Sequence, residues 1–129
     1  MEILYEDNHI IAINKSSSDI VQGDKTGDKP LVDTVREYLK EQYSKSGNVF
    51  CGVVHRLDRP VSGVVLFAKT SKALARLNEM LRGHEIKKKY WAIVVKPPQE
   101  QEATLKHYLV RNERQNKSYA YTTEKKGSK

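Results

Sequence analysis

The densest group of chemically capable side chains is the nine-residue segment 55–63, His-Arg-Leu-Asp-Arg-Pro-Val-Ser-Gly. Asp58 stands between Arg56 and Arg59, and a carboxylate flanked by two guanidinium groups is expected to stay ionised. Such an anion can act as a nucleophile or as a general base. Taken by themselves, however, the residues favour Asp58 as an ion-paired residue that forms a turn, and His55 as a structural histidine.

Two apolar segments flank this polar stretch, and both are predicted to be β-strands. Residues 50–54 form a short run, and residues 64–68, Val-Val-Leu-Phe-Ala, form a near-continuous one that is typical of a strand buried on both faces. Residues 3–5 and 10–13 are β-prone runs around a polar turn, which indicates a hairpin. The polar stretch is therefore expected to emerge at one end of a sheet.

Two amphipathic helices are predicted beside these strands. In residues 32–43 apolar side chains recur at a spacing near 3.6, and Gly47 is the expected C-cap. The second helix is expected to begin at a cap, Thr70 or Ser71, and to end at Gly83. Its apolar face comprises Ala73, Leu74, Leu77, Met80 and Leu81.

Further strands are predicted towards the C-terminus. Residues 90–95 read as a strand closed by two prolines, with Trp91 in the core, and weaker strands are expected at 104–110 and 118–122. Strands and helices are mixed without strict βαβ alternation, which favours the α+β class. The predicted architecture is a mixed, mainly antiparallel sheet with two flanking helices.

Charge is distributed unevenly along the 129 residues, a length that fits one ordinary domain. Residues 1–64 hold 8 Lys and Arg against 10 Asp and Glu, whereas residues 65–129 hold 15 against 6. This asymmetry indicates a surface that faces a polyanion, although a solvated lysine face that keeps the protein soluble explains it equally well. The cations that could form such a surface are Arg59, Lys69, Lys72, Arg76, Arg82, Lys87, Lys88 and Lys89.

Composition excludes several classes of protein. A single cysteine, Cys51, cannot form an internal disulfide and fits a reducing cytosol. No apolar run approaches the ~20 residues of a membrane span, and the N-terminus does not read as a signal peptide. The four histidines have no metal-ligand spacing. We therefore expect a cytoplasmic protein with no metal centre and no membrane association.

The segment 55–63 resembles the catalytic motif of the RluA-type RNA pseudouridine synthases, His-Arg-Leu-Asp, two variable residues, Thr-Ser-Gly, with Val61 in place of the threonine. Residues 3–15 resemble the family's opening strands, which usually continue Lys-Pro, whereas here three serines follow Lys15. Residues 88–94 resemble its Lys-x-Tyr strand. These three motifs occur in the family's order along the chain.

The resemblance implies an enzyme that isomerises uridine in ribosomal or transfer RNA to pseudouridine and needs no cofactor. It implies that Asp58 is the catalytic carboxylate, which either attacks the sugar carbon or takes a sugar proton. It implies that Arg56 fills the place of the flipped nucleotide or holds it, and that Tyr90 stacks on the uracil. The further RNA-binding candidates are His55, Arg59, Lys88 and Lys89.

The resemblance also bears on domain organisation. The family's catalytic domain is considerably longer, so residues 1–129 are expected to be its N-terminal half, without a preceding S4-like RNA-binding module. A sheet cut in this way exposes a strand edge, so self-association is expected. Two alternatives stay open: a non-catalytic, basic RNA-binding module, and a structural fragment with neither property.

Overall fold

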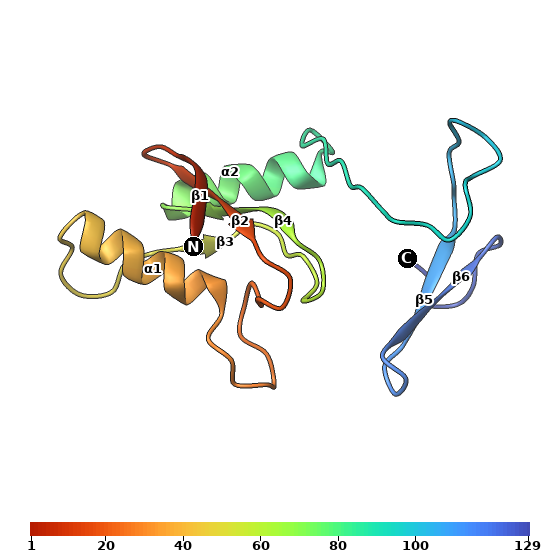
Figure 1. The fold of residues 1–129 in the computed structure, drawn as a ribbon, viewed down its shortest axis with the longest axis horizontal. Coiled ribbons are helices and arrows are strands. Elements are labelled where there is room, and N and C mark those ends of the chain that lie inside the picture. The colour runs from red at the N-terminus through yellow and green to blue at the C-terminus, as the bar shows by residue number, and fades with distance from the viewer. The chain divides into compact units, whose positions relative to one another are not determined.

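The computed structural model describes residues 1–129 and divides them into two compact units, Met1–Lys89 and Tyr90–Lys129 (Figure 1). No helix in either unit is long and apolar enough to cross a membrane. The elements are two helices and antiparallel strands, so the predicted α+β class is confirmed.

The first unit contains a four-stranded sheet in the order β1-β2-β4-β3. Its strands are β1 (Glu2–Glu6), β2 (Ile10–Lys15), β3 (Gly52–Val53) and β4 (Gly63–Ala68). Every neighbouring pair is antiparallel, and β2 pairs with β4 along its whole length. The predicted N-terminal hairpin is therefore confirmed, and the polar segment 55–63 lies largely in the connection from β3 to β4.

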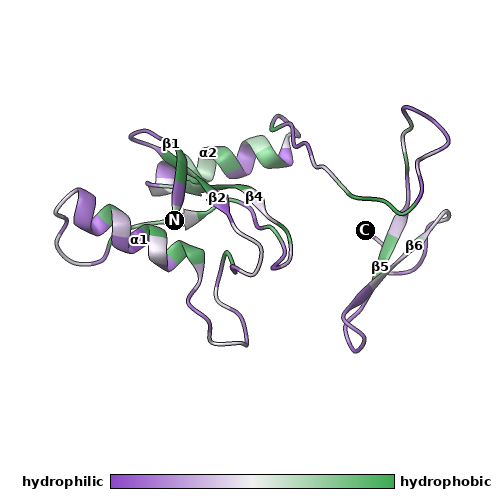
Figure 2. Cartoon of the chain, viewed as in Figure 1, coloured by the Kyte–Doolittle hydropathy of each residue, from purple (hydrophilic) through white to green (hydrophobic).

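Helices α1 (Leu31–Gln42) and α2 (Ser71–Arg82) cover opposite faces of this sheet (Figure 1). On the α1 face, Ile11 pairs with Phe67 and Ile13 with Val65, and all four side chains are fully buried. The α2 face is built around Val54, Ala68 and Ala73, with partly buried leucines of the helix packed against them. Figure 2 shows apolar residues along β2 and β4 and in stripes on both helices.

The boundaries of α2 follow the prediction. Thr70 is the N-cap, and its Oγ1 accepts the backbone N–H of Ala73 at 3.1 Å; Gly83 is the C-cap. The predicted cap of the first helix was wrong. Helix α1 ends at Gln42, and Gly47, with a φ of 73°, serves a turn farther along the chain.

Two burial predictions were wrong. Val64 on β4 is 53% exposed, because α2 packs against the other end of this strand, at Leu66 and Ala68. The segment 90–95 is not a strand, and Trp91 lies outside any core with a fully exposed side chain. A strand requires a neighbour to bind its backbone groups, and no segment of the second unit pairs with these residues.

The second unit contains a β-hairpin, β5 (Tyr108–Asn112) and β6 (Lys117–Tyr121). Both weak strands predicted here are confirmed, the first with its start moved towards the C-terminus. The C-terminal residue extends the pairing, because Lys129 and Leu109 exchange backbone hydrogen bonds of 3.0 and 3.1 Å.

Candidate active site

Four of the seven predicted site residues lie together on the connection between β3 and β4. His55 is half-buried, whereas Arg56 and Asp58 are exposed. Asp58 forms no ion pair with either neighbouring arginine. The expected ion-paired arrangement around Asp58 was therefore wrong, and its carboxylate oxygens are free to meet a reactant.

The guanidinium group of Arg59 is held by the preceding loop instead. Its Nη2 lies 2.8 Å from Asp28 Oδ2 and 3.8 Å from Asp24 Oδ2, and it donates to Thr26 Oγ1 at 3.1 Å. The hydrogen bond to Asp28 raises the pKa of Arg59 above its ordinary value, so the cation is permanent. The backbone oxygen of Arg59 accepts the N–H of Ser18 at 2.9 Å. These bonds connect the loop after β2 to the segment that carries Asp58.

A buried lysine on β2 also holds the segment that carries Asp58. Lys15 has no exposed surface, and its Nζ donates to the backbone oxygens of Ser16 at 3.0 Å, Arg59 at 3.1 Å and Val61 at 2.6 Å. Burial lowers the pKa of Lys15, an effect that the nearby carboxylates of Asp19 and Asp58 partly offset. The ammonium group of Lys15 therefore holds the backbone on both sides of Pro60.

This role of Lys15 was not predicted, although the sequence contains a signal for it. Ile11, Ile13 and Lys15 occupy alternate positions of one strand, and alternate side chains point to the same face. A lysine in the inward register of a buried strand must satisfy its three N–H donors inside the protein. The pattern could have predicted a buried cation, but not which carbonyl groups receive it.

His55 closes the sheet at the start of the connection from β3 to β4. Val53 pairs with Phe67, so a continued strand would place Val54 opposite Leu66. The side chain of His55 takes that position, and its Nε2 accepts the backbone N–H of Leu66 at 3.2 Å. Because an acceptor nitrogen carries no proton, the imidazole is neutral with its proton on Nδ1, which is buried without a partner.

The electrostatics of His55 agree with a neutral ring. Burial lowers the pKa of His55, and the nearby positive charge of Lys88 lowers it further. Lys88 and Lys89 are exposed at the end of the first unit. Tyr90 begins the second unit, with 63% of its surface exposed.

A hollow of about 520 Å³ adjoins the start of the connection. Its lining includes His55 and two arginines, Arg56 and Arg36. The guanidinium group of Arg36 is ion-paired with Asp33. Cys51 also lines it, but burial raises the pKa of this thiol to about 11, which makes it a poor nucleophile at neutral pH. Positive charge thus borders a concave surface beside the loop of Asp58.

Lys69 does not belong to a phosphate-binding surface, contrary to the sequence-based expectation. It is 8% exposed, and its Nζ lies 2.6 Å from Glu6 Oε1 and donates to Asp7 O at 2.6 Å and Tyr43 Oη at 3.0 Å. Lys72 and Arg76 remain exposed on α2. No three His, Cys, Asp or Glu side chains of the chain come together as a metal site.

The match to a family of known proteins extends over both units of the chain. Residues 9–129 match the model of a family described as RNA pseudouridylate synthase. Ribosomal large subunit pseudouridine synthase C of Buchnera aphidicola is 42% identical over 92 residues, which cover 71% of this chain and 27% of that protein. tRNA pseudouridine synthase C of Vibrio cholerae is 37% identical over 94 residues, which cover 73% of this chain and 36% of the relative.

The structural comparison extends over nearly the whole chain. The solved structure of Human RNA Pseudouridylate Synthase Domain Containing 4 superposes with a TM-score of 0.79 at 21% identity, covering 99% of this chain and 50% of that one. This likeness concerns the fold. The chain spans about a quarter to a third of the length of the curated relatives that it matches.

Proposed function

The chain belongs to the RNA pseudouridylate synthase family, and we propose that it carries the catalytic carboxylate, Asp58, for isomerising uridine to pseudouridine in RNA. One observation supports this role most strongly: Asp58 is exposed and free of ion pairs on a connection that three other side chains hold in place. Preorganisation of this kind is what a reacting group requires. We propose that residues 1–129 form part of the catalytic domain.

The chemistry needs an anion that can approach the sugar. The N1–C1′ bond breaks, the uracil turns, and a C5–C1′ bond forms; the proton on C5 leaves and N1 gains one, so the atoms balance without a redox partner. Asp58 would either add to the sugar carbon or take a sugar proton. Its free oxygens suit both routes.

The substrate-binding residues follow from the need to take the base out of its stack. We assign Arg56, whose exposed guanidinium group borders the hollow, to the flipped nucleotide or the space it leaves. We assign Tyr90 to stacking on the uracil, and Lys88 and Lys89 to phosphate groups.

The other two candidates have contacts that favour positioning. His55 binds the backbone of β4, and Arg59 binds the loop of Asp24 and Asp28. We propose that both side chains affect RNA binding only by positioning the connection from β3 to β4. Relatives named for ribosomal and transfer RNA make these two RNAs the candidate substrates, and such a reaction would take place in the cytoplasm.

Tritium release from RNA labelled at C5 of uridine tests the proposal. The polypeptide encoded by the complete gene is compared with its Asp58→Asn and Glu79→Gln variants, since both carboxylates are exposed and Glu79 lies on α2, away from the connection. We expect Asp58→Asn to lower release by at least about 10²-fold, the scale of a lost acid–base group, while RNA affinity stays within about twofold. Glu79→Gln should leave release unchanged.

Unchanged release from Asp58→Asn would remove this residue from catalysis.

A second candidate function, a basic RNA-binding module without chemistry, is favoured by the excess of cations in residues 65–129. It predicts no release from any form, together with RNA affinity that falls with salt by a slope of roughly −0.7 for each phosphate contacted.

A further inference from the structure

Three of the seven tyrosines of the chain lie on one face of the β5–β6 hairpin. Tyr108 pairs with Tyr121, and Val110 pairs with Tyr119. Directly paired side chains, and those two residues apart, point to the same side of a strand pair. Tyr119 is 42% exposed and Tyr121 is 38% exposed, so the rings are accessible.

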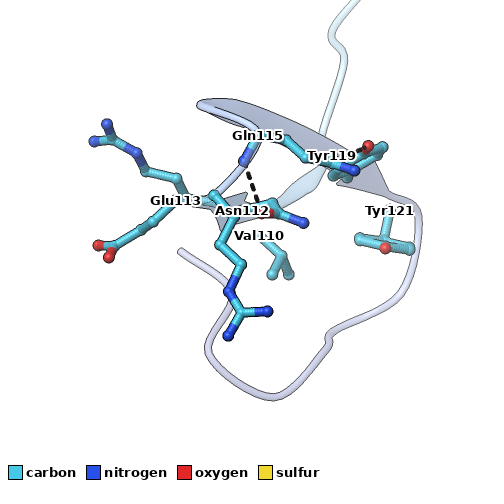
Figure 3. A pocket seen from close by; sticks show the side chains of 8 residues that line it. Val110, Asn112, Glu113, Gln115, Tyr119 and Tyr121 are labelled. Atoms are coloured by element: carbon cyan, nitrogen blue, oxygen red, sulfur yellow. Dashed lines mark hydrogen bonds between the residues drawn. The ribbon is translucent and has the colours of Figure 1, made fainter.

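This face borders a hollow of about 650 Å³ within the second unit. Figure 3 shows Tyr119, Tyr121 and Val110 around it, with the turn residues Asn112 and Gln115 at its end. Tyr119 Oη donates to Gln115 Oε1 at 2.6 Å, and the Gln115 N–H donates to Asn112 Oδ1 at 3.1 Å (Figure 3). These bonds fix the turn and one of the rings before any ligand arrives.

The surroundings of the rings are positively charged. Arg111 and Arg114 line the hollow, against a single carboxylate, Glu113. Lys125 Nζ lies 5.5 Å from the centre of the Tyr121 ring. Residues 90–129 hold 8 Lys and Arg and 4 Asp and Glu, so the whole unit attracts anions.

The combination of residue types identifies one kind of partner. Val110 is the only aliphatic side chain in the lining, so an apolar peptide or helix finds little to bury. Aromatic rings that accept stacked bases, bordered by cations that bind the backbone, are the features of single-stranded nucleic acid surfaces. Arginine also stacks on bases through its planar group.

We propose that this hairpin face binds a single-stranded stretch of the substrate RNA outside the reacting nucleotide. Bases stack on Tyr119 and Tyr121, and phosphates contact Arg114 in the adjoining turn. The inference rests on the proposed function only in taking RNA as the substrate. It adds a second contact region, on an element separate in sequence from Asp58 and Tyr90.

Fluorescence anisotropy with two labelled RNAs tests this surface. One is a single-stranded RNA of about twelve nucleotides, and the other is an abasic RNA of the same length and charge. The polypeptide of the complete gene should bind the base-containing RNA at least about tenfold more tightly. The double variant Tyr119→Leu/Tyr121→Leu should lose most of this preference and keep only the share that Tyr90 contributes, whereas Tyr119→Phe/Tyr121→Phe should bind like the parent because it keeps both rings.

A matched control is Tyr5→Leu, which removes a 53% exposed tyrosine from the first unit and should change neither affinity. Crosslinking with 4-thiouridine RNA, read by mass spectrometry on the unmodified protein, covers the case in which the leucine variant fails to fold. Crosslinks in the peptide of β6 support the proposal, and crosslinks confined to other peptides overturn it. Equal binding of the two RNAs by the parent protein also overturns it.

The two proposals fail in different ways. Base-dependent binding through β6 without tritium release would leave this surface standing and remove the catalytic function. Tritium release with parent-like RNA binding by Tyr119→Leu/Tyr121→Leu would leave the catalytic function and remove the surface.

Discussion

Asp58 forms no ion pair, and two of the cations near it are bound elsewhere. Arg59 is held by Asp24 and Asp28, and Lys15 by three backbone oxygens. The carboxylate oxygens of Asp58 therefore stay open. The sequence could predict the residue types of this loop but not their partners, because the two aspartates that bind Arg59 lie some thirty positions away.

The first prediction concerns Lys15. Lys15→Met keeps the length of the side chain and leaves the backbone oxygens of Ser16 and Val61 without a donor, while the Arg59 oxygen keeps only the N–H of Ser18. A buried polar group left without a partner costs about 1–3 kcal/mol, so we expect the free energy of unfolding to fall by about 3 kcal/mol. Urea denaturation measures this change. Lys25→Met, at an exposed lysine, is the control and should change stability by less than about 0.5 kcal/mol.

His55 gives a prediction about pH. Burial and Lys88 lower its folded pKa below the ordinary value of 6.5, so the unfolded chain binds the proton more readily. The contribution of His55 to stability is therefore complete above pH 6.5 and is lost as the pH falls from there through the lowered folded pKa. His55→Gln places an acceptor near the same position without a titrating group, so it should not show this loss.

Urea unfolding of both forms between about pH 5 and 8 isolates the His55 effect as a difference of two curves. Nitrogen-15 NMR of the imidazole provides an independent readout. The structure requires the form with its proton on Nδ1, because Nε2 accepts the backbone N–H of Leu66. Parallel pH curves together with a proton on Nε2 would contradict the assigned role. A loss of stability at acid pH in the parent protein but not in His55→Gln would support the role of neutral His55 as the acceptor of the Leu66 N–H.

At the scale of elements, a buried polar cluster ties α1 to the N-terminal hairpin and to the end of β4. Glu6 accepts from Tyr38, Tyr43 and Lys69, and the side chains of Glu6 and Lys69 are 15% and 6% exposed. Burial would raise the pKa of Glu6, but the bonds from Lys69, Tyr43 and Tyr38 outweigh it and lower the pKa. The cluster therefore favours the ionised carboxylate.

Breaking this cluster should destabilise the first unit. Lys69→Met leaves Glu6 buried beside two tyrosine hydroxyl groups, and removing one partner of a buried ion pair costs roughly 3–5 kcal/mol. The stabilisation from Glu6 is complete above its unfolded pKa of about 4.5 and is lost as the pH falls through the lowered folded value. Denaturation of Lys69→Met, with Lys72→Met on the exposed side of α2 as control, measures the loss; equal stabilities would contradict it.

Elements with local signals could be predicted, whereas those that depend on distant partners could not. The β1–β2 hairpin and the Thr70 cap of α2 are encoded in neighbouring residues, and both were predicted correctly. Residues 90–95 have strand-forming side chains, yet a strand forms only beside another strand. The side chains of residues 90–95 therefore indicate a strand, but without a pairing partner these residues do not form one.

At the scale of the whole molecule, this unpaired segment becomes the main liability. Trp91, Ile93 and Val95 have essentially fully exposed side chains, and the segment contains no charge and no proline. Short runs with high β-propensity and free backbone groups pair readily with other chains. The net charge of +7 opposes association between copies, and this repulsion is screened by salt.

We therefore predict that the 129-residue chain self-associates, and more strongly at high salt. Sedimentation velocity over a range of concentrations should show species larger than the monomer, and Trp91→Lys/Ile93→Lys should shift them to the monomer, because charged side chains block edge pairing. Leu105→Lys removes an 81% exposed side chain outside the segment and should leave association unchanged. A chain that stays monomeric at high concentration and high salt would contradict this prediction, because the exposed apolar side chains would then not cause association. Association that persists in the double lysine variant would instead place the contact on another surface, such as the exposed edge strand β1.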